Sequence, residues 1–505
     1  MKIILEERLC EEAMEKLNAA GVDVAVDAEL TEAASADAVI LTGHVPLPES
    51  IYEDTAAVRV LGCLGQDNEN FDRTRATKSG LMLLEPRYGE AASVADDALY
   101  LMLSMARERK DDSAIELKDK TIGFLGFPPL AGEIAKRAQG FGMQMLCYDP
   151  DLNRGRAMLY HCESTSLVDL FVRSDFVVLL ALPQEWNQGL VGKDEIQLMK
   201  KGAGLICLTD PQIFRWEELV RALDWGYLDY FAIDLPAGQE ALAKEVAPYG
   251  RVTVAEAANT CEARIGNQVE MARDVVAALS GEQVDTATNV ARVHVANLKE
   301  GSRWCNLGHL LGVFMGQRLS ALPEALDIEE SGALPVTESD AIVASLLAGL
   351  AEGLGARKVN PVNSRLWAEE QGLQLQFKKN SSLQNEQLRL SVETPSVHLQ
   401  VAGDRAGGED NIIQVDDYYF RGHPHEHVLL VPHINRPGLI GQVGTLLGEK
   451  DVNIAEMVLG YKQQDRTTAL MWMQIEQPVD RSISEESRKL ASVLSMEYIH
   501  LPIKE

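Results

Sequence analysis

The sequence predicts an α/β protein in which two doubly wound domains precede two smaller α+β domains. Over roughly the first 280 residues, short apolar runs alternate with amphipathic stretches of helical spacing, which is typical of parallel sheets covered by helices. From about residue 293 the pattern changes to apolar helices and strands of alternating polarity. The last 80 or so residues follow a strand-helix-strand-strand-helix-strand order, which predicts a ferredoxin-like unit.

Bulk composition limits the class of protein. A chain of 505 residues is long enough for three or four domains, and its net charge of -29 argues against nucleic acid or an anionic membrane as a partner. Seven scattered cysteines without a C-x-x-C pair suit the reducing cytoplasm. We expect no membrane span, because no apolar run reaches about 18 residues, and no signal peptide, because the first residues lack a long apolar core.

The first domain begins with a strand and an amphipathic helix that ends at Gly21. Its expected strands are Lys2–Glu6, Val22–Val26, Ala38–Leu41, Val58–Leu61 and Leu81–Leu84. Residues 62–70 form a polar, glycine-bearing loop directly after a strand, the position at which such sheets bind ligands. A helix predicted over Val94–Arg107 leads to the next domain.

The second domain is predicted from residues 120–150, which read as strand, tight turn, helix and strand. Asp149 follows the second strand, where dinucleotide-binding folds hold the ribose hydroxyls. The turn departs from G-x-G-x-x-G, because Pro128 and Ala131 replace the second and third glycines after Gly126. Proline adds a ring and removes an N–H where the pyrophosphate approaches, so we expect a Rossmann-type unit with weak dinucleotide binding. Further strands are expected over Phe176–Leu180, Gly204–Leu208 and Tyr230–Ile233, before a long helix over Glu262–Leu279 that returns to the first domain.

Several motifs resemble the long-form D-3-phosphoglycerate dehydrogenases, members of the D-2-hydroxyacid dehydrogenase family. They are GCLGQDNENFD at 62–72, SVADD at 93–97, TIGFLGF…CYDP at 121–150, AIDLP at 232–236, NTCEARIGNQVEMARDVVAALSGE at 259–282 and HINRPGLIGQVGTLLGEKDVNIAEM at 433–457. The resemblance implies a substrate domain (1–98 and 283–300), an inserted NAD domain (99–282), an intervening regulatory domain (301–424) and an ACT-type domain (425–505). It also implies NAD as cofactor, L-serine as effector and a homo-oligomer.

The resemblance further implies a catalytic histidine, a glutamate that orients it and an arginine that grips the substrate carboxylate. The matching positions hold Ala255, Gln239 and Asp210. No histidine lies between His161 and His294, so a small shift of the alignment does not supply the general base. The glutamate position is less certain, because Glu240 stands next to Gln239 and a shift of one residue would supply a glutamate. Loss of a general base costs about 10²–10⁴ in rate, so we expect no useful turnover of 3-phosphoglycerate.

Other family positions are retained or ambiguous. Gly126, Asp149 and Asp234 match cofactor-binding positions, although the two aspartates could instead cap local turns. Cys63 and Gly65 match the substrate loop, where a basic residue usually stands at the position of Cys63. Ser93 also matches a substrate-loop position, and its alternative role is a helix N-cap.

In the last domain, His433, Asn435 and Asn453 match the serine-binding positions of ACT-type domains. The helix expected after Gly438 offers N–H groups to a carboxylate, and the alternative is a pair of capped turns. The resemblance places the ligand at an interface between two paired domains.

His423, His425 and His427 would share one face of an extended segment, but no fourth ligand is evident and we expect no metal site.

Two functions remain open. The first is a phosphoglycerate-dehydrogenase-like protein with an impaired or inactive active site and a serine-sensing end, which could co-assemble with an active relative. The second is an active NAD-dependent dehydrogenase of 3-phosphoglycerate or another 2-hydroxy acid, with rearranged catalytic groups.

Overall fold

The computed structural model describes residues 1–43, 45–53, 57–64, 72–86, 89–108, 114–150, 152, 154–181, 187–225, 227–228, 230–235, 239–248, 251–254, 260–282, 284, 286–290, 298–331, 340–356, 358–380, 386–394 and 397–503. It contains two compact units, the first built mainly from the chain up to Thr288 and the second mainly from Asn289 onward. None of the helices in these ranges is long and apolar enough to cross a membrane.

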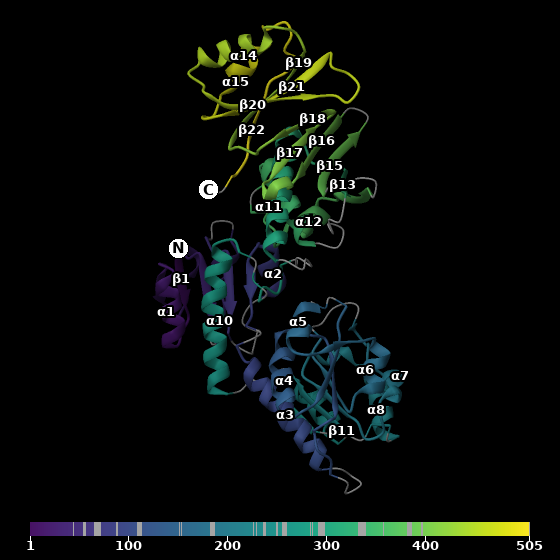
Figure 1. Ribbon diagram of the computed structural model, residues 1–505. Helices are drawn as coiled ribbons and strands as arrows, with labels where there is room; N and C mark the ends of the chain where they lie inside the picture. The colour runs from purple at the N-terminus through teal and green to yellow at the C-terminus, as the bar shows by residue number, and fades with distance from the viewer. Residues whose placement is uncertain are drawn as a thin grey trace. The chain divides into compact units, whose positions relative to one another are not determined.

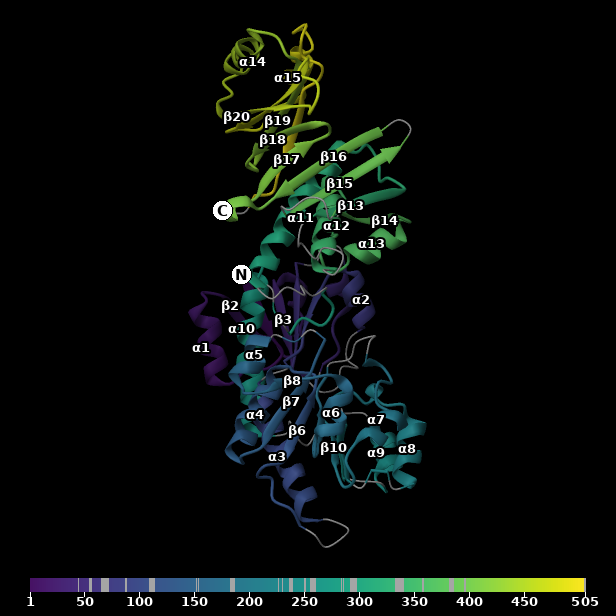
Figure 2. The same ribbon diagram turned by 45° about the vertical axis from the view of Figure 1, so that its right-hand side comes forward.

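The first sheet has five strands in the order β2-β1-β3-β4-β5. Its strands are β1 (Lys2–Leu5), β2 (Asp23–Val26), β3 (Ala38–Leu41), β4 (Val60–Cys63) and β5 (Met82–Leu84). Its helices are α1 (Glu11–Ala19), α2 (Arg73–Lys78) and the long α10 (Cys261–Leu279), with short 3-10 turns at η1 (Ala33–Ser35) and η2 (Glu49–Tyr52). Helices α1 and α10 lie side by side (Figures 1 and 2).

The second sheet is parallel, with seven strands in the order β12-β11-β10-β9-β6-β7-β8. Its strands are β6 (Thr121–Leu125), β7 (Gln144–Tyr148), β8 (Glu163–Ser164), β9 (Phe176–Leu179), β10 (Gly204–Cys207), β11 (Tyr230–Leu235) and β12 (Arg251–Val254). The helices are α3 (Ala91–Arg107), α4 (Pro129–Gly140), α5 (Arg154–Leu159), α6 (Leu167–Arg173), α7 (Lys193–Leu198), α8 (Trp216–Asp224) and α9 (Glu240–Val246), with a 3-10 turn η5 (Pro211–Ile213).

This strand order reverses direction at β6, which is the doubly wound arrangement expected of a dinucleotide-binding domain. Alternate residues of each strand face opposite layers, so Phe124 and Val178 pack with α3 and α4, whereas Val177 and Leu179 pack with α6 and α8. The chain then returns through α10, and Thr286 O accepts the N–H of Glu85 at 2.9 Å. The predicted insertion of this domain into the first one is therefore confirmed.

Most of the second unit comes from the chain after residue 297, which is built on a ten-stranded sheet. The intervening part contains α11 (Leu298–Arg318), β13 (Ala325–Ser331), α12 (Asp340–Gly353), α13 (Ser364–Glu370), β14 (Gln374–Asn380), β15 (Gln387–Thr394), β16 (Val397–Asp404), η6 (Ala406–Gly408), β17 (Asn411–Val415) and β18 (Tyr418–Gly422). The C-terminal module contains β19 (His427–Ile434), α14 (Leu439–Gly448), β20 (Ile454–Tyr461), β21 (Thr468–Ile475), α15 (Arg481–Ser487) and β22 (Glu497–His500).

Helices α11 and α12 are in backbone contact because glycines line their interface. A Cβ added to Gly312 would overlap the carbonyl oxygen of Leu346, and one added to Gly349 would overlap that of His309. The close approach buries the apolar faces of both helices against the sheet, together with Phe314.

The sheet order in the C-terminal module, β20-β21-β19-β22, is that of a ferredoxin-like fold, which confirms the predicted fold class. One face of this sheet packs against α14 and α15 through residues such as Val431 and Met471. The opposite face carries Trp472, whose ring lies 6.1 Å from that of Phe314 and 5.4 Å from that of Phe420. The module and the intervening part therefore share one hydrophobic core.

The two parts also share one hydrogen-bonded sheet, because β18 pairs with β20 at Tyr419 and Tyr461. Arg318 at the end of α11 is largely buried and joins them by ion pairs to Asp416, before β18, and to Glu497 on β22, at 2.9 and 2.8 Å. The sequence boundary expected near residue 425 therefore falls within a continuous sheet and core.

Candidate functional site in the crevice of the doubly wound sheet

The turn between β6 and α4 keeps the geometry of a dinucleotide-binding turn at its first residue. Gly126 has φ of +86°, and a Cβ there would lie 2.5 Å from the backbone of Ala181. The Asp149 carboxylate at the end of β7 accepts the N–H of Phe127 at 2.8 Å, which fixes the turn to the neighbouring strand. Gly126 and Asp149 thus lie together where the sequence placed them.

The same turn offers few N–H groups to a phosphate. Pro128 is the N-cap of α4 and Pro129 its first residue, so neither has an N–H, and the N–H of Ala131 donates to Pro128 O at 3.0 Å. An anion at a helix N-terminus is bound by these first N–H groups. The turn therefore lacks most of the donors that a pyrophosphate requires.

The two described catalytic positions do not supply a substrate grip or an oriented base. Asp210 follows β10 and caps the short η5 turn, where its Oδ1 accepts the N–H of Gln212 at 2.8 Å. Gln239 is exposed and precedes α9, and Ala255 lies outside the described residues.

Arg215, the arginine nearest in sequence to Asp210, is held by other groups. Its guanidinium contacts Glu195 at 2.6 Å, Glu218 at 3.0 Å and the carbonyl oxygen of Gly189 at 2.5 Å. Such charge-assisted contacts are the strong class of protein hydrogen bonds. Arg215 is therefore committed to the α7–α8 region and does not replace the missing arginine.

Several of the described residues at the crevice are carboxylates. The pKa of the Cys207 thiol at the end of β10 is raised to about 12, mainly by burial and in part by the Asp210 and Asp234 carboxylates. Burial also raises the pKa of the Glu90 carboxyl before α3; a hydrogen bond from Asn267 opposes this, and the Glu270 and Asp234 carboxylates add to it. The neighbouring carboxylates thus disfavour the charged forms of both Cys207 and Glu90.

Glu90, Thr260 and Asn267 were not singled out from the sequence. Thr260 is the N-cap of α10, a role that a threonine directly before a helix could have suggested from the sequence. Its Oγ1 lies 2.6 Å from Ser93 Oγ.

Ser93 lies inside the first turn of α3, whose N-cap is Glu90, so the N-cap role considered for Ser93 is wrong. The helix begins at Ala91 because this alanine-rich stretch extends it by one turn beyond the predicted start.

The substrate loop is only partly described. Cys63 is the last residue of β4 and is 4% exposed, so its thiol belongs to the interior of the first sheet. Gly65 lies outside the described residues.

Residues of the C-terminal module

The three expected effector residues lie at two ends of one sheet. His433 near the end of β19 is 2% exposed, and its Nδ1 lies 2.9 Å from Val431 O. Asn435 follows β19 and donates from its side chain to Arg466 O at 3.1 Å. Asn453 precedes β20, and it is exposed.

The strand register gives their separation. His433 pairs with Ala469 on β21, whereas Ile454 pairs with Ile475, six residues further along β21. At about 3.3 Å per residue this is about 20 Å. One chain therefore does not bring Asn453 to His433 and Asn435.

Strand β18 covers the end of β20. Besides the Tyr419–Tyr461 bridge, the side chain of Lys462 bonds Asp417 at 3.0 Å, and a Cβ on Gly460 would lie 2.9 Å from the ring of Phe420. A second copy can pair along the whole of β20 only if β18 moves away from Tyr461.

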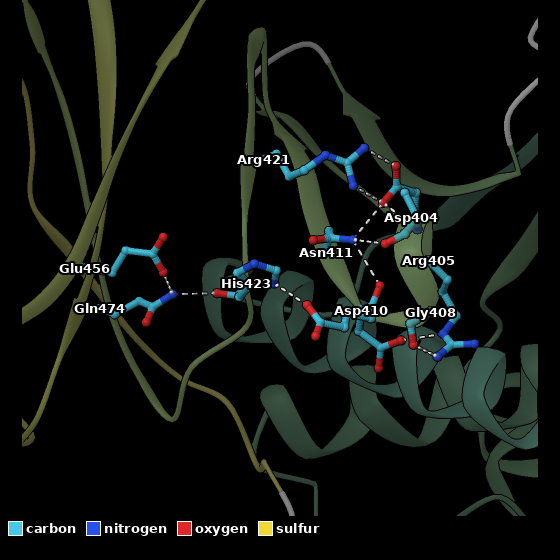
Figure 3. Close-up of polar contacts among 11 residues, drawn as sticks. Asp404, Arg405, Gly408, Asp410, Asn411, Arg421, His423, Glu456 and Gln474 are labelled. Atoms are coloured by element: carbon cyan, nitrogen blue, oxygen red, sulfur yellow. Dashed lines mark hydrogen bonds and ion pairs between the residues drawn. The ribbon is translucent and has the colours of Figure 1, made fainter.

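Another polar link joins the module to the intervening part (Figure 3). The side chain of Gln474 donates to His423 O at 3.2 Å and to Glu456 at 2.7 Å. Farther from the module, Asp404 is buried and accepts both arms of Arg421, at 2.9 and 2.6 Å, together with the amide of Asn411 at 3.0 Å (Figure 3).

Comparison with known proteins agrees with this architecture. Residues 95–254 match the NAD-binding domain of the D-isomer specific 2-hydroxyacid dehydrogenases, and residues 302–416 match the D-3-phosphoglycerate dehydrogenase intervening domain. The chain is 26% identical over 532 residues to D-3-phosphoglycerate dehydrogenase of Archaeoglobus fulgidus, covering 99% of this chain and 100% of that protein. It is 24% identical over 524 residues to that of Methanocaldococcus jannaschii (99% and 100%) and 26% identical over 477 residues to that of Synechocystis sp. (90% and 86%). The chain is therefore a homologue of D-3-phosphoglycerate dehydrogenases along almost its whole length, with an NAD-binding domain of the D-isomer specific 2-hydroxyacid dehydrogenase type followed by the intervening domain of the phosphoglycerate dehydrogenases.

Proposed function

We propose that this chain is a D-3-phosphoglycerate-dehydrogenase-like protein of cytoplasmic L-serine biosynthesis whose dehydrogenase site is impaired or inactive. The observation that carries the proposal is Asp210 at the arginine position, with Arg215 held by Glu195 and Glu218. Two like charges about 4 Å apart cost on the order of 4 kcal/mol at an effective dielectric of about 20, roughly a thousandfold in binding. Without the histidine, a further two to four decades in rate are lost.

The test is a rate measurement on purified protein with NAD and 3-phosphoglycerate. We expect turnover far below the 1–10³ s⁻¹ of ordinary enzymes. The triple variant Asp210→Arg, Gln239→Glu, Ala255→His should gain activity, with Asp210→Asn as the control that removes charge alone. An ordinary rate in the unmodified protein would contradict the proposal.

NAD is the cofactor that the family implies, and Gly126, Asp149 and Asp234 are the residues that would hold it. When bound, NAD accepts hydride from C2 of the substrate. The missing N–H groups at Pro128 and Pro129 support weak binding of NAD. A ligand present at 100 times its dissociation constant raises the free energy of unfolding by about 2.7 kcal/mol. In a thermal-shift measurement, NAD and NADH should therefore stabilise the protein less than a tightly bound ligand would.

We propose that the C-terminal module senses L-serine at a site shared by two copies of the chain, or by this chain and an active relative. His433 and Asn435 would come from one copy and Asn453 from the other, because the strand register keeps them apart in one chain. Loss of either asparagine leaves ligand groups unpaired at about 1–3 kcal/mol, a 5- to 150-fold loss of affinity.

Mixing two variants tests the shared site. Asn435→Ala and Asn453→Ala should each weaken serine binding to the full chain, whereas the mixed pair should recover half of the high-affinity sites, because one of its two sites holds both asparagines. Asn18→Ala, a change on α1 of the first sheet, is the control. No binding of serine at millimolar concentration, or no recovery on mixing, would contradict a two-copy site.

An active dehydrogenase with a rearranged site is the second candidate. It is favoured by Glu90, a crevice carboxyl whose raised pKa suits a proton carrier. Turnover of another 2-hydroxy acid that Glu90→Gln abolishes would select this function.

A further inference from the structure

We propose that Glu426, His427 and His500 form a binding site for a zinc-like divalent transition-metal ion at the β19–β22 edge of the C-terminal module. The site lies outside the crevice and does not depend on the proposed function. Sequence reasoning grouped His427 with His423 and His425, whereas strand pairing sets it opposite a residue 73 positions away.

The register brings the two imidazoles together. His427 and His500 are direct partners across antiparallel β19 and β22, and their ring centroids lie 5.4 Å apart. One ligand atom from each of Glu426, His427 and His500 lies within 4.8 Å of the others. Donor atoms about 2.0–2.1 Å from a tetrahedral zinc ion are about 3.3 Å from one another. The ligand atoms here would have to approach one another by about an ångström or more, which rotation of the exposed Glu426 and His500 side chains allows.

The surroundings hold the ligands as a metal site requires. Nδ1 of His427 lies 2.7 Å from the hydroxyl of Tyr498, which orients the ring and leaves Nε2, 3.9 Å from Glu426, on the ligand side. The backbone of His500 is fixed by the amide of Gln317, which bonds its N–H and its carbonyl at 3.0 and 2.5 Å.

The ligand chemistry selects the ion. Two imidazole nitrogens and one carboxylate suit Zn²⁺, with Ni²⁺ and Cu²⁺ as related guests, whereas Mg²⁺ and Ca²⁺ prefer oxygen ligands. Three protein ligands leave a coordination position for water or another donor. A bound ion would tie the first strand of the module to its last.

The test is calorimetric titration of the tag-free full chain, stripped with chelator, using Zn²⁺ and Mg²⁺. We expect one zinc site per chain that His500→Ala weakens at least tenfold, no comparable response to Mg²⁺, and cobalt absorption bands that the same variant removes. Glu426→Gln removes an exposed ligand and provides a second variant that leaves both rings in place. His398→Ala, an exposed histidine on β16, is the matched control and should bind zinc like the unmodified chain.

Zinc binding that survives both His500→Ala and Glu426→Gln would place the ion elsewhere and overturn the proposal. Absence of binding at hundred-micromolar zinc would overturn it as well.

Discussion

The side-chain amide of Gln317 pairs with both backbone groups of His500, as a neighbouring strand would. It donates to the carbonyl at 2.5 Å and accepts the N–H at 3.0 Å. An exposed strand edge is a template for unwanted pairing, and this contact closes part of the β22 edge with a residue from α11. Gln317→Ala should lower the free energy of unfolding by about 1–2 kcal/mol, since two net hydrogen bonds are lost. Urea unfolding measures this loss of stability. The control is Gln371→Ala at an exposed position, which should change the free energy of unfolding by less than about 0.5 kcal/mol.

The glycine contact between α11 and α12 predicts opposite effects for two identical substitutions. Gly312→Ala should destabilise the protein by about 3 kcal/mol or more, because its methyl group would overlap the Leu346 carbonyl. Gly444→Ala on α14 meets open space and should stabilise by about 0.5–1 kcal/mol through helix propensity. Guanidinium unfolding gives the free energy of unfolding of both variants. Equal changes in the two variants would contradict the close backbone contact between α11 and α12.

Restoring N–H groups at the α4 turn should strengthen NAD binding. In Pro128→Gly/Pro129→Ala, each new N–H to a phosphate contributes about 1.5–3 kcal/mol, so affinity should improve at least tenfold. The single Pro129→Ala variant should show a smaller gain. Low-micromolar NAD binding in the unmodified protein, measured by calorimetry, would show that the prolines do not limit affinity.

Glu90 should make stability depend on pH with a defined sign. Because the folded protein raises its pKa above the usual value of about 4.3, its favourable contribution is fully present below about pH 4.3 and is lost as the pH rises through the folded value. Glu90→Gln should therefore stabilise the protein at pH 7, and the gain should shrink toward pH 4. Exposed Glu15→Gln should show no such trend, and a gain for Glu90→Gln that is equal at both pH values would exclude ionisation as its cause.

If two copies must pair along β20, β18 has to leave Tyr461 first. Cysteines replacing Tyr419 and Tyr461, which face each other in the ladder, should form a disulfide that keeps β18 in place. The oxidised variant should lose serine binding and recover it on reduction, whereas the Tyr419→Cys single variant should not respond to reductant. Undiminished binding in the oxidised form would mean that the pocket forms without this rearrangement.

The two parallel sheets could be predicted from the sequence, because buried strands such as Phe176–Leu179 are continuous apolar runs between polar helices. Sequence reasoning missed β13, β17 and β18. Strand β13 depends on a distant partner, because it pairs with β15 about 60 residues later, whereas β17 pairs with its sequence neighbours β16 and β18. Local pattern has no access to the distant pairing of β13.

The site was predictable where one residue type decides the chemistry, as at Asp210 and Pro128. It was not predictable where geometry decides. Nothing local marks Glu90 as half-buried beside Asn267, or His427 as the partner of His500, since both depend on how distant elements pack. The distance of Asn453 from Asn435 likewise follows from strand order and not from the matching motif.

The core shared by Phe314, Phe420 and Trp472 limits the modularity of this protein. A fragment starting at residue 425 would expose Trp472, Val428 and Leu430 to solvent. Fusing it to another catalytic chain would therefore transfer only one side of this hydrophobic core. A transplantable piece of this end of the chain therefore has to include α11, which begins at Leu298, so that the intervening part and the C-terminal module move together.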